Sequence, residues 1–369
     1  MSNGAIAWQD GRVGSGKVTL QTIADTVGVS RMTVSNAFSK PDQLSSELRE
    51  RILATASELG YAGPDPAARR LARGRAGTVG ILLTDSLAYA FDDEIAARFV
   101  GAIAAELAPT GLAITLLTAN DTGDAFPARD IPMDAALVYS CDHRSAAIDW
   151  LIRRRLPLVF VDQAPRPGYD SVNIDDRGGA TLASRHLVEL GHRRIGMITA
   201  SLAGPVGLLD DPVASSGNAV GHQRVLGWLE GLADAGDEAR PAVVQLDHFG
   251  ESAGQEGARR LLDLEEPPTA ILCVSDLAAV GAIEVLQSRG LSVPGDVSVV
   301  GFDGIQLAAR MEPTLTTVRQ DVERKGREAA RALRARMAAR FDGEPEPELR
   351  RVELPVELVV GRSTAPPPA

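Results

Sequence analysis

Residues 19–38, TLQTIADTVGVSRMTVSNAF, decide how this chain begins to fold. Thr19 is a suitable N-cap, and the apolar residues that follow recur along one helical face. Gly28 then permits the positive φ that a tight reversal needs, and Ser30 caps a second short helix whose Val34 faces inward. This spacing predicts a helix-turn-helix. The alternative is any two short helices that happen to be joined by a glycine.

The second helix has a face that core packing does not use. Val34 and Ala37 point inward, so the remaining side chains are free to meet base edges in a major groove. A third amphipathic helix, about Ser46 to Leu59, completes the smallest bundle of this kind that buries a core. The candidate DNA-binding residues are Thr19, Ser30, Arg31, Met32, Thr33, Ser35 and Asn36.

A basic stretch, GYAGPDPAARRLARGRAG, follows at residues 60–77. Asp65 is placed to cap a short helix, with Pro66 in its first position. Leu71 stands among arginines, and an apolar residue on a basic helix is what a minor-groove wedge requires. The alternative is a basic linker without such a role.

Charge is distributed unevenly along the 369 residues, whose formal net charge is −11. Residues 17–75 hold nine Lys or Arg and six Asp or Glu, a net charge of +3, and residues 76–369 carry −14. A basic head on an acidic body confines attraction for phosphate to the head. Only three of the 38 basic residues are lysines, Lys17, Lys40 and Lys325, which we interpret as a codon bias towards Arg.

From Thr78 onwards, short apolar strands alternate with amphipathic helices. Strand–helix alternation predicts parallel sheets with right-handed crossovers. The pattern runs once and then restarts, so we expect two doubly wound lobes with a ligand cleft at the carboxyl ends of the strands. The expected strands are 78–84, 112–118, 135–140 and 156–162, then 193–200, 242–246, 270–275 and 297–303.

Acidic residues end or directly follow four of these expected strands: Asp85, Asp162, Asp276 and Asp303. Converging carboxylates are good acceptors for ligand hydroxyl groups, although Asp276 is equally well explained as a cap of the next helix. An arginine in GHQRVLGW can supply a bidentate donor, and an aromatic residue can form an apolar wall for a sugar or purine ring. These last two effector-binding candidates are Arg224 and Phe249.

Other classes of function find little support in the sequence. The five histidines have no metal-ligand spacing, and neither a nucleophile elbow nor a dinucleotide glycine pattern occurs, so we expect no metal, no cofactor and no enzyme. The stretch Gly11–Lys17 resembles a phosphate loop but lacks the following Ser or Thr and a preceding strand. No apolar run long enough for a membrane span or signal peptide is present, so we expect a cytoplasmic protein.

The head and body together resemble the lactose-repressor (LacI/GalR) family of bacterial transcription regulators. The family pattern V-T-[IL]-x-x-[IV]-A-x-x-[AV]-G-V-S-x-x-T-V-S is matched by VTLQTIADTVGVSRMTVS at residues 18–35, and L-G-Y stands before the hinge. The stretch Tyr61–Leu71 is one residue longer than in the lactose repressor, which leaves the start of the hinge helix open. The VG[FY]DD motif is present around Asp303, with Gly304 as a departure.

This resemblance implies an all-α helix-turn-helix head with a hinge helix, joined to an α/β, periplasmic-binding-protein-like, two-lobed domain. It also implies that Leu71 pries open the central base step of a pseudo-palindromic operator and that Arg224, Phe249, Asp303, Asp85 and Asp162 contact the effector. The expected boundaries are a disordered stretch at 1–16, the head at 17–63, hinge helix and linker at 64–76, lobe one at 77–163 and 322–350, lobe two at 164–321 and 351–363, and a tail at 364–369.

We therefore expect a sequence-specific DNA-binding transcription regulator. The resemblance to the family implies that it acts as a repressor. It would bind double-stranded operator DNA as a homodimer, because no leucine heptad follows the core, and a small-molecule effector such as a sugar would control it. A solute-binding protein for transport is the alternative for the body alone, and the head argues against it. A nucleotide-dependent enzyme would need a phosphate loop that the sequence lacks.

Overall fold

The computed structural model divides the chain into two compact units, Met1–Ala76 and Gly77–Ala369, and each is treated by itself below. Our predictions for residues 1–16, for the hinge helix with Leu71, and for Asp85 lie outside the described residues. Every helix within the described ranges is too short or too polar to cross a membrane. The described residues are 18–63, 74–83, 87–118, 126–140, 145–200, 204–213, 219–233, 236 and 239–368.

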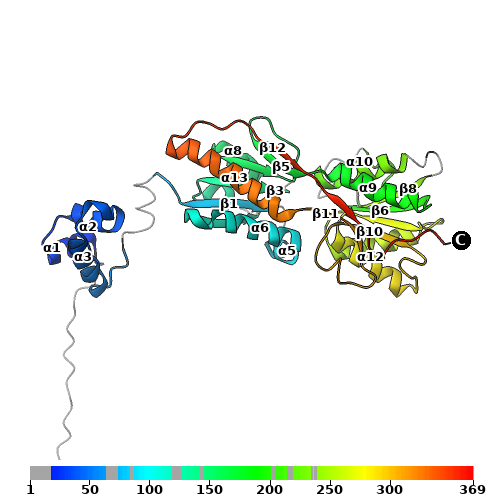
Figure 1. The fold of residues 1–369 in the computed structure, drawn as a ribbon, viewed down its shortest axis with the longest axis horizontal. Helices are drawn as coiled ribbons and strands as arrows, with labels where there is room; N and C mark the ends of the chain where they lie inside the picture. The colour runs from blue at the N-terminus through cyan, green and yellow to red at the C-terminus, as the bar shows by residue number, and fades with distance from the viewer. Residues whose placement is uncertain are drawn as a thin grey trace, which may run out of the picture. The chain divides into compact units, whose positions relative to one another are not determined.

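Residues 18–63 of the first unit form a three-helix bundle (Figure 1). Gly28 takes φ 77° at the end of the first helix, so the predicted helix-turn-helix is confirmed together with its turn. Six fully buried apolar side chains, among them Ala24 and Val34, form the core between the helices. The elements are α1 (Leu20–Val27), α2 (Arg31–Ser39), the 3-10 helix η1 (Pro41–Gln43) and α3 (Ser46–Glu58).

Lobe one of the second unit is built on a six-stranded, wholly parallel sheet in the order β12-β5-β4-β3-β1-β2. Its strands are β1 (Thr78–Leu83), β2 (Ala113–Thr118), β3 (Ala135–Tyr139), β4 (Leu158–Val161), β5 (Asp170–Ile174) and β12 (Arg351–Leu354). Its helices are α5 (Leu87–Asp92), α6 (Glu94–Leu107), η2 (Ala108–Thr110), α7 (Pro127–Asp130), α8 (Ala146–Arg153) and α13 (Val322–Asp342).

Helices cover both faces of the lobe-one sheet. Helices α6 and α13 pack against each other, and α13 lies across β3, β4 and β5 (Figure 1). On the opposite face, alternate strand residues such as Val138 and Phe160 pack with Ile148 of α8. A parallel sheet with helices on both faces is the doubly wound arrangement that the strand–helix alternation predicts.

Lobe two is built on a seven-stranded sheet in the order β13-β11-β10-β9-β6-β8-β7. Only the two edge strands, β13 and β7, are antiparallel to their neighbours. Its strands are β6 (Arg194–Ala200), β7 (Gly207–Leu208), β8 (Arg240–Leu246), β9 (Ala270–Cys273), β10 (Ser298–Asp303), β11 (Thr316–Arg319) and β13 (Glu357–Val359). Its helices are α9 (Asp176–Glu189), α10 (Ala219–Leu232), α11 (Glu251–Leu262) and α12 (Asp276–Ser288).

Two of the expected lobe boundaries need correction. The sheet of lobe one includes β5 and β12, so the chain leaves this lobe after Ile174 and again after Leu354, not after residues 163 and 350. Both strands are short and rich in polar residues, so neither forms the apolar run by which a buried strand is recognised. The remaining crossover, between β11 and α13, falls where we expected it.

The expected C-terminal tail also begins too early. The backbone oxygen of Ala365 accepts hydrogen bonds from the buried side chains of His192 and Ser298, at 2.8 Å and 3.1 Å. Thr364 Oγ1 is hydrogen-bonded to His186 Nε2 at 2.9 Å. Residues 364 and 365 are therefore part of lobe two, because they satisfy polar groups that would otherwise be buried without partners.

Candidate DNA-binding face and ligand site

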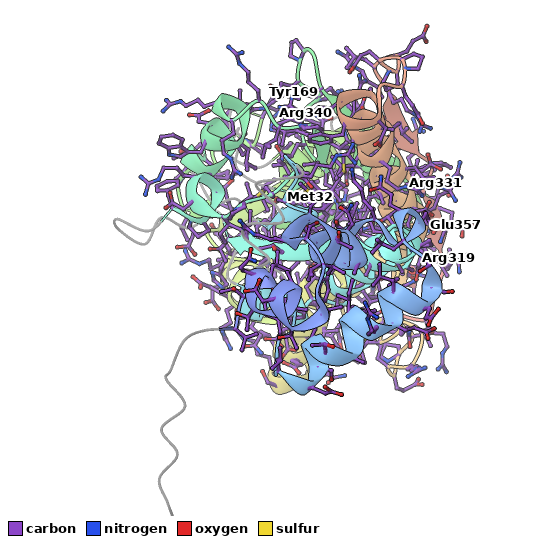
Figure 2. The ribbon with its side chains drawn as sticks, turned by 90° about the vertical axis from the view of Figure 1, so that its left-hand side faces the viewer. Met32, Tyr169, Arg319, Arg331, Arg340 and Glu357 are labelled. Carbon is purple, nitrogen blue, oxygen red and sulfur yellow. The ribbon has the colours of Figure 1, made fainter. Side chains whose placement is uncertain are left out.

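The first turn of α2 is held by its cap. Ser30 Oγ accepts a hydrogen bond from the backbone N–H of Thr33 at 3.0 Å and lies 2.8 Å from Thr33 Oγ1. Arg31 and Met32 follow as exposed side chains, and Met32 is 69% exposed at the surface of the head (Figure 2). The exposed thioether of Met32 has no role in the core of the head. A side chain on a capped helix that is exposed in this way is available for a contact with DNA.

Asn36 lies farther along α2 and is half-buried. Its Nδ2 donates a hydrogen bond to Gln43 Oε1 of η1 at 3.1 Å, so one amide proton and the Oδ1 acceptor remain for another partner. That pair of groups is what the N6 and N7 edge of adenine requires. We did not predict Gln43, because it lies in η1, beyond the end of α2 at Ser39, and the helical pattern that places Asn36 does not extend to it.

Thr19 and Ser35 complete the predicted DNA-binding set. Thr19 Oγ1 accepts from the backbone N–H of Thr22 at 3.3 Å and forms a capping box with it, which confirms the predicted cap. Ser35 is half-buried, and its backbone oxygen accepts from Ser39 Oγ at 2.8 Å. A DNA contact by Thr19 or Ser35 remains a prediction.

Arg224 is the centre of a buried charged cluster in the second unit. It projects from α10 and is 5% exposed. Its Nε donates to Asp176 Oδ1 at 2.8 Å, its Nη1 donates to the backbone oxygen of Val274, and both terminal nitrogens lie 3.5 Å from Asp303 Oδ1. Its guanidinium also lies 3.5 Å from the centroid of the Phe302 ring. The structure thus brings the predicted Arg224 and Asp303 together.

Asp303 ends β10 with φ 117°, a conformation that few side-chain-bearing residues adopt. Its Oδ1 accepts a hydrogen bond from Gln320 Nε2 at 2.8 Å. Burial raises the pKa of this carboxyl to about 7, against the opposing effect of the Arg224 charge. Burial likewise raises the pKa of Asp176 to about 6.

Lys325 connects this cluster to lobe one. It lies on α13, is fully buried, and donates through Nζ to Asp162 Oδ2 at 2.5 Å and to Gln320 Oε1 at 2.8 Å. A continuous series of contacts therefore runs from Arg224 through Asp303, Gln320 and Lys325 to Asp162. We predicted neither Gln320 nor Lys325, although a lysine in a chain whose basic residues are nearly all arginines was an available signal.

Asp162 follows β4 in the left-handed region, with φ 52°, and is 8% exposed. Its Oδ2 is paired with Lys325, but its Oδ1 is buried and has no hydrogen-bond partner among the described residues. A buried carboxylate oxygen without a partner is costly, so it marks a position where a bound molecule can donate.

The structure gives Asp276 a different task from the predicted ligand contact. This residue is fully buried, and its two oxygens accept from the backbone N–H of Ile305 at 2.8 Å and from Thr317 Oγ1 at 2.5 Å. The cap of α12 is Ser275, whose side chain accepts from Ala278 N at 3.2 Å. Burial and the nearby Asp303 raise the pKa of Asp276 to about 8. Asp276 therefore fastens the loop after β10 to β11.

Phe249 and Asp85 are not brought into this cluster by the described contacts. Phe249 follows β8 and is a half-buried side chain packed on the apolar core, and Asp85 lies outside the described residues. Both stay predicted effector contacts. Within the described ranges, no group of three or more His, Cys, Asp or Glu side chains is arranged to hold a metal ion.

Comparisons with known proteins match both units. Residues 19–63 match the family described as bacterial regulatory proteins, lacI family, and residues 184–364 match the periplasmic binding protein-like domain. An HTH-type transcriptional regulator of Mycolicibacterium smegmatis is 37% identical over 365 residues, which cover 95% of this chain and 97% of that protein.

Solved structures agree with this likeness. A structure of the transcriptional regulator CelR in complex with cellobiose has 29% identity and a TM-score of 0.67, and covers 94% of this chain and 100% of its own. A lac repressor dimer bound to operator and the anti-inducer ONPF has 25% identity and a TM-score of 0.73, with coverages of 94% and 99%. On this evidence the chain belongs to the LacI family of bacterial transcriptional regulators.

Proposed function

We propose that this regulator is a repressor whose hold on a specific operator is controlled by a small molecule bound beside Asp162 and Arg224. The observation that carries the proposal is the Asp162 Oδ1 atom, a buried acceptor without a described partner at the end of a chain of paired charges. Such an atom has no use in a protein that only binds DNA, because the head alone supplies a DNA-reading helix.

The nature of the small molecule is proposed from the same residues. The carboxylates of Asp162 and Asp303 accept hydrogen bonds, and the amide of Gln320 both donates and accepts them. Groups of this kind recognise the hydroxyl groups of a ligand. The relative CelR, solved with cellobiose, supports a ligand of the carbohydrate type. A repressor that acts as a dimer on a pseudo-palindromic site is supported by the relative solved as a dimer on its operator.

In this proposal Leu71, which lies outside the described residues, is the wedge that enters the central base step. Two such wedges meet only when the lobes of two subunits stand at the right distance, so closure of the ligand site changes operator affinity. A fall in operator affinity would mean that the small molecule releases the operator. A rise would mean that it strengthens the binding.

The experiment selects an operator from a random duplex library with the full-length protein and then measures its affinity with and without a deproteinised metabolite extract. We expect the extract to change operator affinity for the native protein. Arg224→Ala should keep operator affinity in the absence of extract and lose the response, because its loss leaves Asp176 and Asp303 buried without their cation and so disrupts the site. An unchanged response would remove Arg224 from the proposed site.

The competing function, solute binding for transport, is separated by the same selection. A transport protein would return no enriched sequence from the library. The capped and exposed α2 of the head favours the regulator.

A further inference from the structure

We infer that the ligand site selects a hydroxyl-rich molecule that carries neither a phosphate nor a carboxylate group, and that Lys325 is one of the residues that determine this selectivity. The inference rests on the proposed function and names the chemical class of the ligand. It follows from how the charged groups around Asp162 and Arg224 are already paired.

The two buried cations of the cluster are occupied. Arg224 is engaged by Asp176, by the backbone oxygen of Val274 and by Asp303. Lys325 is engaged by Asp162 and by Gln320. An incoming phosphate would have to take one of these cations from its carboxylate, and would leave that carboxylate buried and unpaired.

Helix N-termini are the other common anion sites, and three of them in the second unit are occupied by acidic side chains. Asp93 is the N-cap of α6, Asp175 and Asp176 begin α9, and Asp276 stands in the first turn of α12. Helices α9 and α12 follow β5 and β9 directly, so their N-termini lie at the carboxyl edges of the sheets, where a ligand binds, and α6 follows β1 after the short helix α5. At these three helices the chain's own carboxylates thus fill the position in which the helix end would otherwise attract a phosphate.

A cavity of about 220 Å³ beside the cluster is also lined by acidic side chains. Four of the residues that line it carry carboxyl groups, namely Asp162, Asp175, Asp176 and Glu353. The basic residue among its lining residues, Arg177, is paired with Glu230. The described lining is therefore rich in acceptors and repels an anion, whereas hydroxyl groups donate to it without adding charge.

Lys325 contributes to the selectivity by what it does to Asp162. Its ammonium holds Oδ2 of that carboxylate, and so leaves Oδ1 as the acceptor for a donor from the ligand. Gln320 holds the ammonium on its other side and connects it to Asp303. The positive charge of Lys325 is thus paired within the protein and is not available to an anionic ligand.

The test divides a deproteinised extract of the cells that make the protein on a strong anion exchanger. The flow-through contains neutral and cationic metabolites, and the salt eluate, after desalting, contains the anionic ones. Each pool is added to the full-length protein, and the unfolding midpoint and the affinity for the selected operator are measured. We expect only the flow-through to raise the midpoint by several degrees and to change operator affinity.

Defined compounds sharpen the same comparison. Cellobiose, D-glucose and D-ribose are tested beside D-glucose 6-phosphate, D-glucuronate, D-ribose 5-phosphate and D-glucosamine. A response to the eluate, or to a phosphate or uronate but not to its neutral parent, overturns the inference and leaves the proposed function standing. A response to neither pool contradicts the proposed function itself, and the inference with it.

Two Asp→Asn variants assign the response to the site. Asp162→Asn replaces one carboxylate oxygen by a donor and should weaken the response to the flow-through roughly 10–100-fold. Asp263→Asn makes the same chemical change at an exposed ion pair with Arg289 and should keep the native response. The double variant Asp162→Asn with Lys325→Met removes both charges, so that neither is left buried without a partner. We expect this variant to lose the preference for the flow-through over the eluate, and an unchanged preference would show that Lys325 has no part in selectivity.

Discussion

At the scale of single residues, Asn36 combines a fixed position with a free hydrogen-bonding edge. Its amide is held by Gln43, and α2 is held by the caps that precede it. A side chain oriented in this way loses little freedom when it meets a base, so the hydrogen bonds that it forms contribute to discrimination.

Asn36→Ala should therefore weaken binding to the selected operator by about 1–3 kcal/mol and relax the preference for adenine at one step. The measurement is fluorescence anisotropy on the operator and on random duplex at the same salt concentration. Ser39→Ala, at the exposed end of the same helix, is the matched control and should change neither affinity. An equal loss on operator and random duplex would mean that Asn36 contacts only phosphate.

Asp276 leads to a prediction about pH. Its pKa is 3.8 in an unfolded chain and about 8 in the folded protein, so the folded state holds the proton more tightly. The stability contributed by that proton is fully present below about pH 4 and is lost as the pH rises through about 8. The free energy of unfolding of the second unit should accordingly fall between about pH 4 and pH 8.

Asp276→Asn should make this fall smaller, because the group that gives up the proton is gone. Asp303, whose pKa is raised to about 7, should preserve part of it. Thermal midpoints measured at several pH values check the slope, which is independent of any constant loss of stability in the variant. Asp263→Asn, an exposed carboxylate, is the reference, and identical slopes for the two variants would contradict the assignment.

At the scale of elements, α13 connects parts of the chain that are far apart in sequence. Near its C-terminal end, Arg336 donates to both oxygens of the buried Asp170 in β5, at 2.9 Å and 2.8 Å. The same guanidinium donates to Glu346 Oε1 and to the backbone oxygens of Pro347 and Glu348. Asp170 and the other partners raise the pKa of Arg336 above its usual range. One side chain thereby orders the segment that leads into β12.

Arg336→Met should destabilise the second unit by about 3–5 kcal/mol, because Asp170 is left buried without its cation. Denaturant unfolding of the full chain measures the change. Arg331→Met is the matched control on the same helix, at a residue that lies at the surface (Figure 2) and pairs with Glu106. We expect it to cost less than about 1 kcal/mol. A comparable cost for both variants would show that the loss comes from α13 itself and not from the buried pair.

At the scale of the whole molecule, charge separates the tasks of the two units. The head carries a net positive charge and the rest of the chain a net negative one, so attraction for DNA phosphate belongs to the head. A chain of residues 77–369 should keep its response to the active metabolite pool, measured by thermal midpoint, and lose binding to any duplex at low salt. Retained duplex binding would place a DNA-binding surface on the acidic unit.

Much of the architecture follows from local pattern. Gly28, Ser30 and Val34 predict the helix-turn-helix because caps, turns and helical faces depend on residues a few positions apart. The alternation of apolar strands and amphipathic helices predicts parallel sheets for the same reason. The polar strands β5 and β12 were missed, because what makes them strands is pairing with neighbours and not an apolar run of their own.

The ligand site, too, was predictable from the sequence only in part. Asp162, Asp303 and Arg224 were visible because each stands at a strand end or in a family motif, and topology brings strand ends to one edge. The roles of Lys325 and Gln320, and the engagement of Asp276 within lobe two, were decided only by the tertiary structure. Lys325 is 163 residues from Asp162 along the chain, and the contact between them depends on how α13 packs on the sheet of lobe one. Which carboxylate keeps a free oxygen depends on every neighbour in three dimensions, and no spacing in the chain encodes it.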